Sequence, residues 1–382
     1  MPIQQVLPMP PIYNLRKNVT VSIRIWSEGK GYEVSIQTNW SQPHQFSIEP
    51  TPHDVEELNL GLQEALEQVS RKFGTDEYND AVSNLAKKGD SAFKWIFRDK
   101  KLREKISEVL KTGATIEFSS EDFFIPWELL YDGPLGAEVD VLCFWGMRNV
   151  ISRDLIQKNG LSDLSDLDLP TEHQSLSPRV GLITYNELKH VLEKEIPALQ
   201  ELERQKKILL SCLRPLKTNQ YYDELEYFGR FLGDQGLHIV HLACHAQAIE
   251  PPRQSQSYLR ISDKFSITIE DFRGFEMKNH PLVILNACLT GTIDPLYTSN
   301  WAVWFWKNGA RGVLATEFYV PDWFAAAFIV ELYKELLSDK PIGEVVLETR
   351  RYFWEKHHNL LGLAYALYAR SFISVIHCGP SE

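Results

Sequence analysis

Two stretches near the start of the chain, TVSIRIWS and YEVSIQT, alternate apolar and polar residues with a period of two. Such alternation is typical of half-buried strands, and the EGKG between them is a turn-forming sequence. The pattern predicts a hairpin over residues 20 to 38, with Gly29 and Gly31 as turn residues. From Asp54 to about Lys111 the apolar positions recur instead at intervals of three and four, which predicts two or three amphipathic helices.

Two apolar stretches follow in the N-terminal half. ATIEFSS predicts a strand leading into FFIPWELLYDG, and VDVLCFW, apolar on both faces, predicts a second strand in the middle of a sheet. Residues 155–178 are rich in Ser, Asp, Gly and Pro without a sustained period, which is typical of a linker or exposed loop. We therefore expect an N-terminal α/β region, residues 1–154, and a second domain, residues 179–382.

The second half alternates predicted strands with predicted helices. The strands are the apolar runs RVGLITYN, GLHIVHLACH, LVILNAC and RGVLATEF. Helices are expected over about 187–214, through WAVWFWKNG, from about Asp322 to Leu337 and from Pro341 to about Glu355. This alternation of buried strands and helices indicates an α/β fold with a mostly parallel sheet and helices on both faces.

Composition narrows the classes of function. The chain has 382 residues, 44% of them hydrophobic, which is enough for a sizeable core. Its formal net charge of -11 argues against a general phosphate-binding surface, so we expect no direct nucleic-acid partner. The five cysteines are scattered, which indicates reduced thiols. Because prolines interrupt the N-terminal MPIQQVLPMPPIYN and no apolar run is long enough to cross a bilayer, we expect a cytoplasmic protein without membrane contact.

Two strand ends carry the candidate chemistry. His245 stands where the apolar run of GLHIVHLACH stops, and Cys288 ends LVILNAC. Reacting groups in a parallel sheet gather at the carboxyl ends of the strands, so we expect both side chains at one edge. An imidazole can take the proton of a thiol and later return a proton to a leaving amine. The backbone N–H groups of Ala246 and Cys288 are candidates for holding the oxyanion.

The motifs HLACHAQ, LVILNACLTG and NGARGVLATEFYVPD, in this order, resemble the successive motifs of the CHAT family, relatives of caspases and separase. The likeness extends to FIPWELLYD, PIGEVVLETRRYF and GLAYALY, and it covers roughly residues 115 to 375. It implies a caspase-hemoglobinase-like fold, in which the second domain is catalytic and the first is a related, non-catalytic, pseudo-protease-like half. By position it makes His245 the catalytic histidine, Cys288 the nucleophile and Gly291 the glycine of the turn behind it.

The resemblance also points to a substrate pocket. Asn286 occupies the position where caspases have a glutamine and metacaspases an aspartate in the pocket for the residue before the cut. Its neutral amide does not by itself favour arginine or lysine. Glu317 and Asp322 are further candidates to line that pocket. Ala246 stands where relatives often have glycine, so its backbone is less free to adopt unusual angles, while its N–H remains available.

Other chemistries have weaker support. His238, His241, Cys244 and His245 lie close in sequence, but odd spacings on a strand place side chains on opposite faces, so we expect no metal site. The chain has no phosphate-loop or HExxH motif, and we expect no cofactor. Trp127, within FIPWELLYD, is interpreted as a packing residue.

These features predict a cysteine endopeptidase with a His–Cys dyad that cleaves a specific protein substrate. The resemblance implies a regulated effector of prokaryotic antiviral defence or cell death, switched on by a separate activating or sensor protein. The alternative is a catalytically silent signalling or scaffold module with the same fold. The presence of both His245 and Cys288 favours the enzyme.

Overall fold

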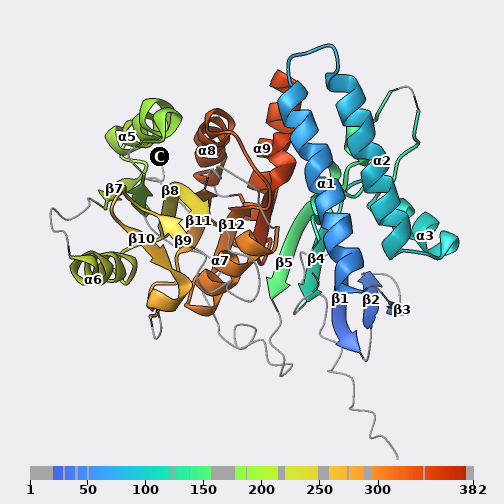
Figure 1. The fold of residues 1–382 in the computed structure, drawn as a ribbon, viewed down its shortest axis with the longest axis horizontal. Helices are drawn as coiled ribbons and strands as arrows, with labels where there is room; N and C mark the ends of the chain where they lie inside the picture. Colours follow the sequence, from blue (N-terminus) through green and yellow to red (C-terminus); the bar gives the residue numbers. More distant parts are fainter. Residues whose placement is uncertain are drawn as a thin grey trace, which may run out of the picture.

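The chain folds into two α/β units that lie side by side (Figure 1). The computed structural model describes residues 20–28, 31–38, 42–49, 51–120, 123, 125–136, 138–155, 177–185, 187–213, 220–247, 258–272, 275–287, 295–338 and 340–375. Each unit is built on one sheet. Most of the predicted linker, residues 156–176, lies outside the described residues, so the domain boundary stays a prediction.

The N-terminal sheet has the strand order β3-β2-β1-β4-β5. The predicted hairpin is confirmed, since β1 (Val21–Glu28) and β2 (Gly31–Thr38) pair in antiparallel fashion. β2 also pairs with β3 (His44–Ile48), while β1, β4 (Thr115–Ser120) and β5 (Val150–Leu155) run parallel.

Three helices follow the hairpin, as the helical period predicted. They are α1 (Pro52–Lys72), α2 (Tyr78–Ile96) and α3 (Lys100–Leu110). Thr51 and Asp54 form a capping box at the start of α1, in which each side chain accepts a hydrogen bond from the backbone N–H of the other. Leu102, Ile106 and Leu110 of α3 are buried.

The prediction of a central strand at VDVLCFW is wrong. The segment forms a short 3-10 helix, η2 (Val141–Cys143), and then enters α4 (Trp145–Arg148). Asp140 accepts a hydrogen bond from the backbone N–H of Leu142 at 3.0 Å, which starts the helical turn, and the Leu142 side chain is 49% exposed. A short apolar run does not by itself distinguish a buried strand from helical turns.

Among the described residues the second sheet has eight strands, and it confirms the predicted α/β architecture. Its parallel core joins β6 (Arg179–Thr184), β8 (Ile239–Gln247), β11 (Leu282–Ala287) and β12 (Gly312–Thr316), and the antiparallel β13 (Tyr365–Ala369) pairs with β12. β7 (Leu209–Cys212) pairs with β6, while β9 (Tyr258–Arg260) and β10 (Ser266–Thr268) extend the sheet from the end of β8.

Helices cover both faces of this sheet. In Figure 1, α5 (Ile196–Arg204), α8 (Asp322–Leu336) and α9 (Ile342–His357) lie above the strands. α6 (Tyr221–Leu232) and α7 (Pro295–Lys307) lie below them. The helix predicted over 187–214 ends at Arg204, and the chain then forms β7, whose Leu209 is 53% exposed. None of the four residues of β7 is buried, so its sequence shows no apolar alternation that would predict a strand.

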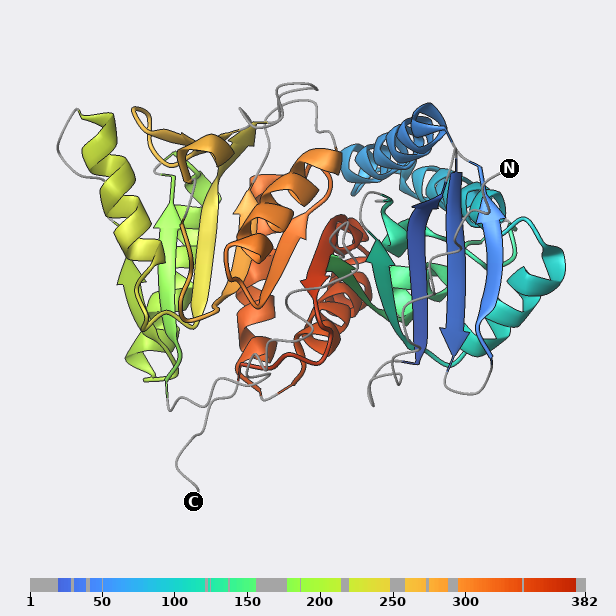
Figure 2. The ribbon, with the colours of Figure 1, turned by 90° about the horizontal axis from the view of Figure 1, so that it is seen from below.

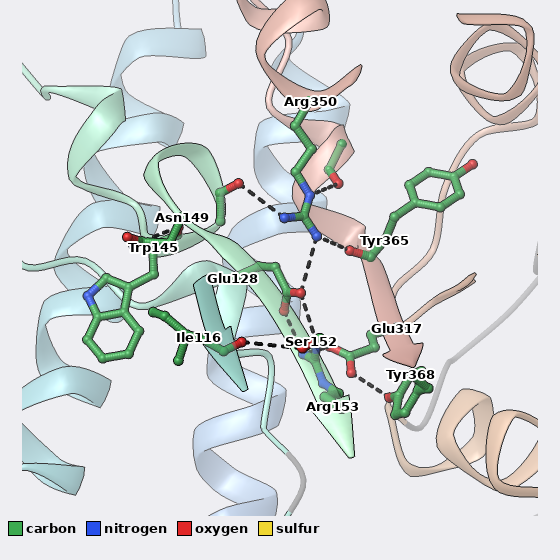
Figure 3. A network of polar contacts seen from close by, with 12 residues as sticks. Ile116, Glu128, Trp145, Asn149, Ser152, Arg153, Glu317, Arg350, Tyr365 and Tyr368 are labelled. Atoms are coloured by element: carbon green, nitrogen blue, oxygen red, sulfur yellow. Dashed lines mark hydrogen bonds and ion pairs between the residues drawn. The ribbon is translucent and has the colours of Figure 1, made fainter. Parts of the chain in front are cut away.

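The two sheets meet through their end strands, β5 and β13, which lie side by side (Figure 2). Four charged side chains are enclosed at this seam: Glu128, Arg153, Glu317 and Arg350 are each at most 4% exposed. We refer to these four residues as the seam cluster. Figure 3 shows them converging from both halves of the chain.

Glu128 is the centre of the seam cluster. Arg153 contacts both of its carboxylate oxygens, and Arg350 donates to Oε1 at 3.2 Å. Arg350 also donates to the carbonyl of Gly146 at 3.1 Å. A Cβ at Gly146 would lie only 2.7 Å from the Cβ of Glu128, so glycine permits this close approach. Buried ions need such complete pairing, because each loses its hydration on folding.

We expect Glu128→Ala to lower the free energy of unfolding by about 3–5 kcal/mol, because it leaves the enclosed Arg350 without its carboxylate partner and Arg153 with Glu317 alone. Urea unfolding followed by tryptophan fluorescence measures this change. Glu104→Ala is the matched control: it breaks the 3.8 Å pair with the exposed Lys100 and should cost less than about 1 kcal/mol. Equal losses in the two variants would contradict the structural importance of the seam.

Candidate active site

The parallel pairing of β8 and β11 determines where the predicted dyad belongs. The register runs from Leu282 opposite Ile239 to Ala287 opposite Cys244. The residues that follow Ala287 and Cys244 in the sequence are Cys288 and His245. His245 is half-buried within β8, which continues to Gln247 by pairing with β9, so the predicted loop begins later than expected. Cys288 and Gly291 lie outside the described residues.

Tyr185 holds one side of the His245 ring. Its own ring, which follows β6, meets the imidazole edge to face at a centroid distance of 4.9 Å. The Tyr185 hydroxyl donates to Asp263 at 2.7 Å and lies 3.1 Å from a carboxylate oxygen of Glu187. The hydrogen bond to Asp263, with burial and Glu187 adding to it, raises the pKa of Tyr185 to about 12. At neutral pH the Tyr185 side chain is therefore uncharged, and its hydrogen bond to Asp263 fixes its ring against the imidazole.

Asn286, the first pocket candidate, is fully buried, and its side-chain amide is occupied at both ends. Nδ2 donates to Glu195 at 3.2 Å, and Oδ1 accepts from the hydroxyl of Tyr365 at 2.9 Å. This position does not favour a contact with substrate. The hydrogen bonds instead tie the end of β11 to a helix and to β13.

Glu317, the second pocket candidate, belongs to the seam cluster. Its carboxylate lies 3.1 Å from Arg153 Nη2 and accepts a hydrogen bond from Tyr368 at 2.6 Å. With 4% of its surface exposed and its oxygens engaged, Glu317 is placed to join the two sheets, and its position does not favour a pocket wall. Burial raises the pKa of Glu317 to about 7; Arg153 opposes this shift, but the nearby Glu128 adds to it.

Asp322, the third candidate, is the more accessible one. It is the first residue of α8, its side chain is 36% exposed, and one carboxylate oxygen lies 3.9 Å from His190 Nε2. Its place in a substrate pocket stays a prediction. So does the oxyanion role of Ala246, which is 7% exposed and stands opposite Leu259 in the β8–β9 ladder.

The remaining histidines and cysteines of β8 and its approach have separate surroundings. Nδ1 of His238 accepts a hydrogen bond from the backbone N–H of Arg179, and the fully buried His241 contacts Glu195. Cys244 is also fully buried. Within the described ranges, no three His, Cys, Asp or Glu side chains are grouped to hold a metal ion.

The sequence did not single out Glu195 or Tyr185. Glu195 is one of several glutamates in one helical segment, and most of its neighbours there are exposed. The pattern of apolar and polar residues therefore does not distinguish this buried glutamate from the exposed ones. Pro197 inside the predicted helix was the available signal of an irregular turn. Tyr185 follows the apolar run of β6 directly, where an aromatic residue is usually part of the core.

The family model of the CHAT domain matches residues 102–367. The chain belongs to the CHAT-domain family. A protein of Vitiosangium sp. (strain GDMCC 1.1324), described as a probable protease, is 25% identical over 256 residues, which are 63% of this chain and 31% of that protein. This CHAT-domain chain thus spans about a third of the length of its curated relative.

The fold of this CHAT-domain chain resembles a chain of the Saccharomyces cerevisiae separase–securin complex. Two crystal structures of that complex match with TM-scores of 0.52 and 0.50 at 12% identity, covering 91% and 92% of this chain and 30% of the other. The likeness shows the expected caspase-hemoglobinase-like fold. In the described part of the chain, no helix combines the length and apolar character that crossing a membrane requires.

The buried and exposed thiols of this chain should differ sharply in reactivity. Burial raises the pKa of Cys244 to about 12, whereas Cys212 is exposed. Since only the thiolate is alkylated, iodoacetamide at pH 8 should modify Cys212 at least about 100-fold faster than Cys244. Peptide mapping by mass spectrometry measures both rates, and unfolding in urea should abolish the difference. Rapid modification of Cys244 in the folded protein would contradict its enclosure.

The seam cluster should give stability a specific pH dependence. Because the folded-state pKa of Glu317, about 7, lies above the ordinary value of 4.5, the folded protein retains a proton there that the unfolded chain releases. The resulting stabilisation is full below about pH 4.5 and is lost as pH rises through 7. Glu317→Gln cannot titrate, so from pH 5 to pH 8 the wild-type protein should lose stability relative to the variant in urea unfolding. A constant difference would show an ordinary pKa for Glu317.

Proposed function

We propose that this chain is a cysteine endopeptidase in which Cys288 is the nucleophile and His245 its general base and acid. The register of β8 and β11 carries the proposal: the described pairing stops at Ala287 and Cys244, one residue short of Cys288 and His245 in each strand. The residues that follow the last described pair of two in-register parallel strands are expected side by side at the same edge of the sheet.

The proposed reaction has two steps. His245 takes the proton of the Cys288 thiol, and the thiolate attacks a peptide carbonyl carbon to give a tetrahedral oxyanion, held by the N–H groups of Ala246 and Cys288. The C–N bond then breaks, and the His245 imidazolium gives its proton to the leaving amine. Water, deprotonated by His245, attacks the thioester and forms a C–O bond, the C–S bond breaks to release the carboxylic acid product, and the His245 imidazolium returns its proton to the Cys288 sulfur.

Family membership and the relative described as a probable protease support proteolysis as the activity. We further propose that residues 1–154 are a non-catalytic partner of a catalytic domain comprising residues 179–382. A specific protein substrate, a separate activating protein, a cytoplasmic location and a role in prokaryotic antiviral defence or cell death complete the proposal. These last points rest on the resemblance to the family.

Two substitutions test the dyad. Cys288→Ala should abolish cleavage of a proteome-derived peptide library, and His245→Ala should slow it by about 10²- to 10⁴-fold, the usual contribution of a general base. New peptide termini are counted by mass spectrometry. Cys212→Ala, which changes an exposed thiol on the edge strand β7, is the matched control and should cleave like the wild type.

Thiol reactivity provides a second readout that needs no substrate. In the wild type, alkylation of Cys288 by iodoacetamide should titrate with a pKa below the ordinary value of about 8.5, and His245→Ala should return it to that value. If Cys288 alkylation titrates with the ordinary pKa in both the wild type and His245→Ala, and the wild type cleaves no peptide, the proposed enzyme activity is wrong and the scaffold alternative is favoured. Cleavage that survives Cys288→Ala would assign the activity to another group.

A further inference from the structure

Glu195 is a carboxylate with no exposed surface, placed inside the catalytic half of the molecule. It ends a five-residue π-helical turn, η3 (Val191–Glu195), and α5 follows with Pro197 in its first turn. Proline lacks an N–H donor, and its ring collides with the carbonyl four residues earlier, so the helix widens by one residue here. The wide turn buries Val191 and Glu195 while residues 192–194 between them are exposed.

The enclosed carboxylate has two partners on neighbouring strands. Nε2 of His241, on β8, lies 2.9 Å from Oε1, a polar contact without the alignment of a hydrogen bond. Asn286 Nδ2, on β11, donates to Oε2 at 3.2 Å. Tyr333 of α8 stacks on the His241 ring, and its hydroxyl lies 3.3 Å from Nδ1. Glu195 therefore connects one helix to both strands of the proposed dyad.

Asn286 transmits this contact to the strand end. Its amide is held between Glu195 and the hydroxyl of Tyr365, and the Tyr365 ring stacks on Phe328 at 3.9 Å. Asn286 is two residues before Cys288. Because both ends of the Asn286 amide are held, the backbone of Asn286 has little freedom to shift. The contacts with Glu195 and Tyr365 therefore fix the direction in which β11 ends.

A carboxylate without hydration is a costly way to hold a helix, because its desolvation is offset only by well-placed partners. Leucine of similar size would fill the same space. Here His241 stands four residues before His245 on β8, and Asn286 stands two residues before Cys288 at the end of β11.

We propose that Glu195 is a positioning residue: through Asn286 it fixes the end of β11 so that the Cys288 thiol meets His245. The proposal rests on the proposed function and makes Asn286 part of this support in place of a substrate contact. Positioning predicts an effect on thiol reactivity and on kcat, whereas a pocket residue would change KM and the choice of substrate.

The test compares Glu195→Gln with Glu195→Ala by the rate and pH midpoint of iodoacetamide alkylation at Cys288. Gln retains an oxygen that can accept from Asn286, so its rate should stay within about 3-fold of the wild type. Ala removes the support, and misplacement of a reacting group by about 1 Å can cost 10²-fold, so a 10- to 100-fold loss with a raised midpoint is expected. Glu193→Ala, on the exposed side of the same turn, is the matched control and should match the wild type.

A second variant keeps the test decisive if Glu195→Ala does not fold. Tyr365→Phe removes one hydroxyl from the other end of the Asn286 amide and keeps the ring on Phe328, and it should slow alkylation several-fold. Wild-type alkylation rates in Tyr365→Phe, and in Glu195→Ala if it folds, would overturn the positioning role. Equal losses of rate in Glu195→Gln and Glu195→Ala would overturn it as well. Because alkylation needs no substrate, a wild type that cleaves no peptide would count against the proposed function and leave this comparison valid.

Discussion

The arrangement of this protein depends on charges that must be paired because water cannot reach them. Glu128 has no exposed surface and lies between Arg153 and Arg350, and the second of these comes from a helix 222 residues further along the chain. Burial disfavours ionisation of Glu128, but Arg153 and Arg350 outweigh it and hold its pKa below the usual range. Such a cluster tolerates little displacement, so it holds the two sheets at one relative position.

A second enclosed polar network lies below the edge of the C-terminal sheet, and Tyr365 belongs to both. The backbone carbonyl of Tyr365 accepts from Arg350, and its hydroxyl donates to Asn286. The first residue of β13 is thus attached on one side to the seam and on the other to the strand that precedes Cys288. The N-terminal half therefore contributes Glu128 and Arg153 to the buried contacts that continue through Arg350 and Tyr365 to Asn286, near the candidate site.

Sequence patterns predicted much of this architecture. The hairpin, the three N-terminal helices and the apolar strands that became β4, β6, β8, β11 and β12 follow from local periodicity. β3, β5, β7, β9, β10 and β13 were not predicted. β5 contains Arg153 and Asp154, and a buried arginine that is neutralised by distant partners looks in sequence like a surface residue. The candidate dyad was found because each of its residues ends an apolar run, a local signal.

The sequence by itself determined the hairpin, the strands β4, β6, β8, β11 and β12, and that His245 and Cys288 end two apolar runs, because the residues that mark a strand by their alternation or apolar character lie within about ten positions of one another. Only the tertiary structure decided that Glu195 is enclosed, that Asn286 supports the strand end, and that Glu317 joins the seam. The physical reason is range. Glu195 and Asn286 are 91 residues apart, and Arg153 and Glu317 are 164 apart. These partners are brought together by tertiary packing, and a pattern within a short stretch of sequence cannot predict them.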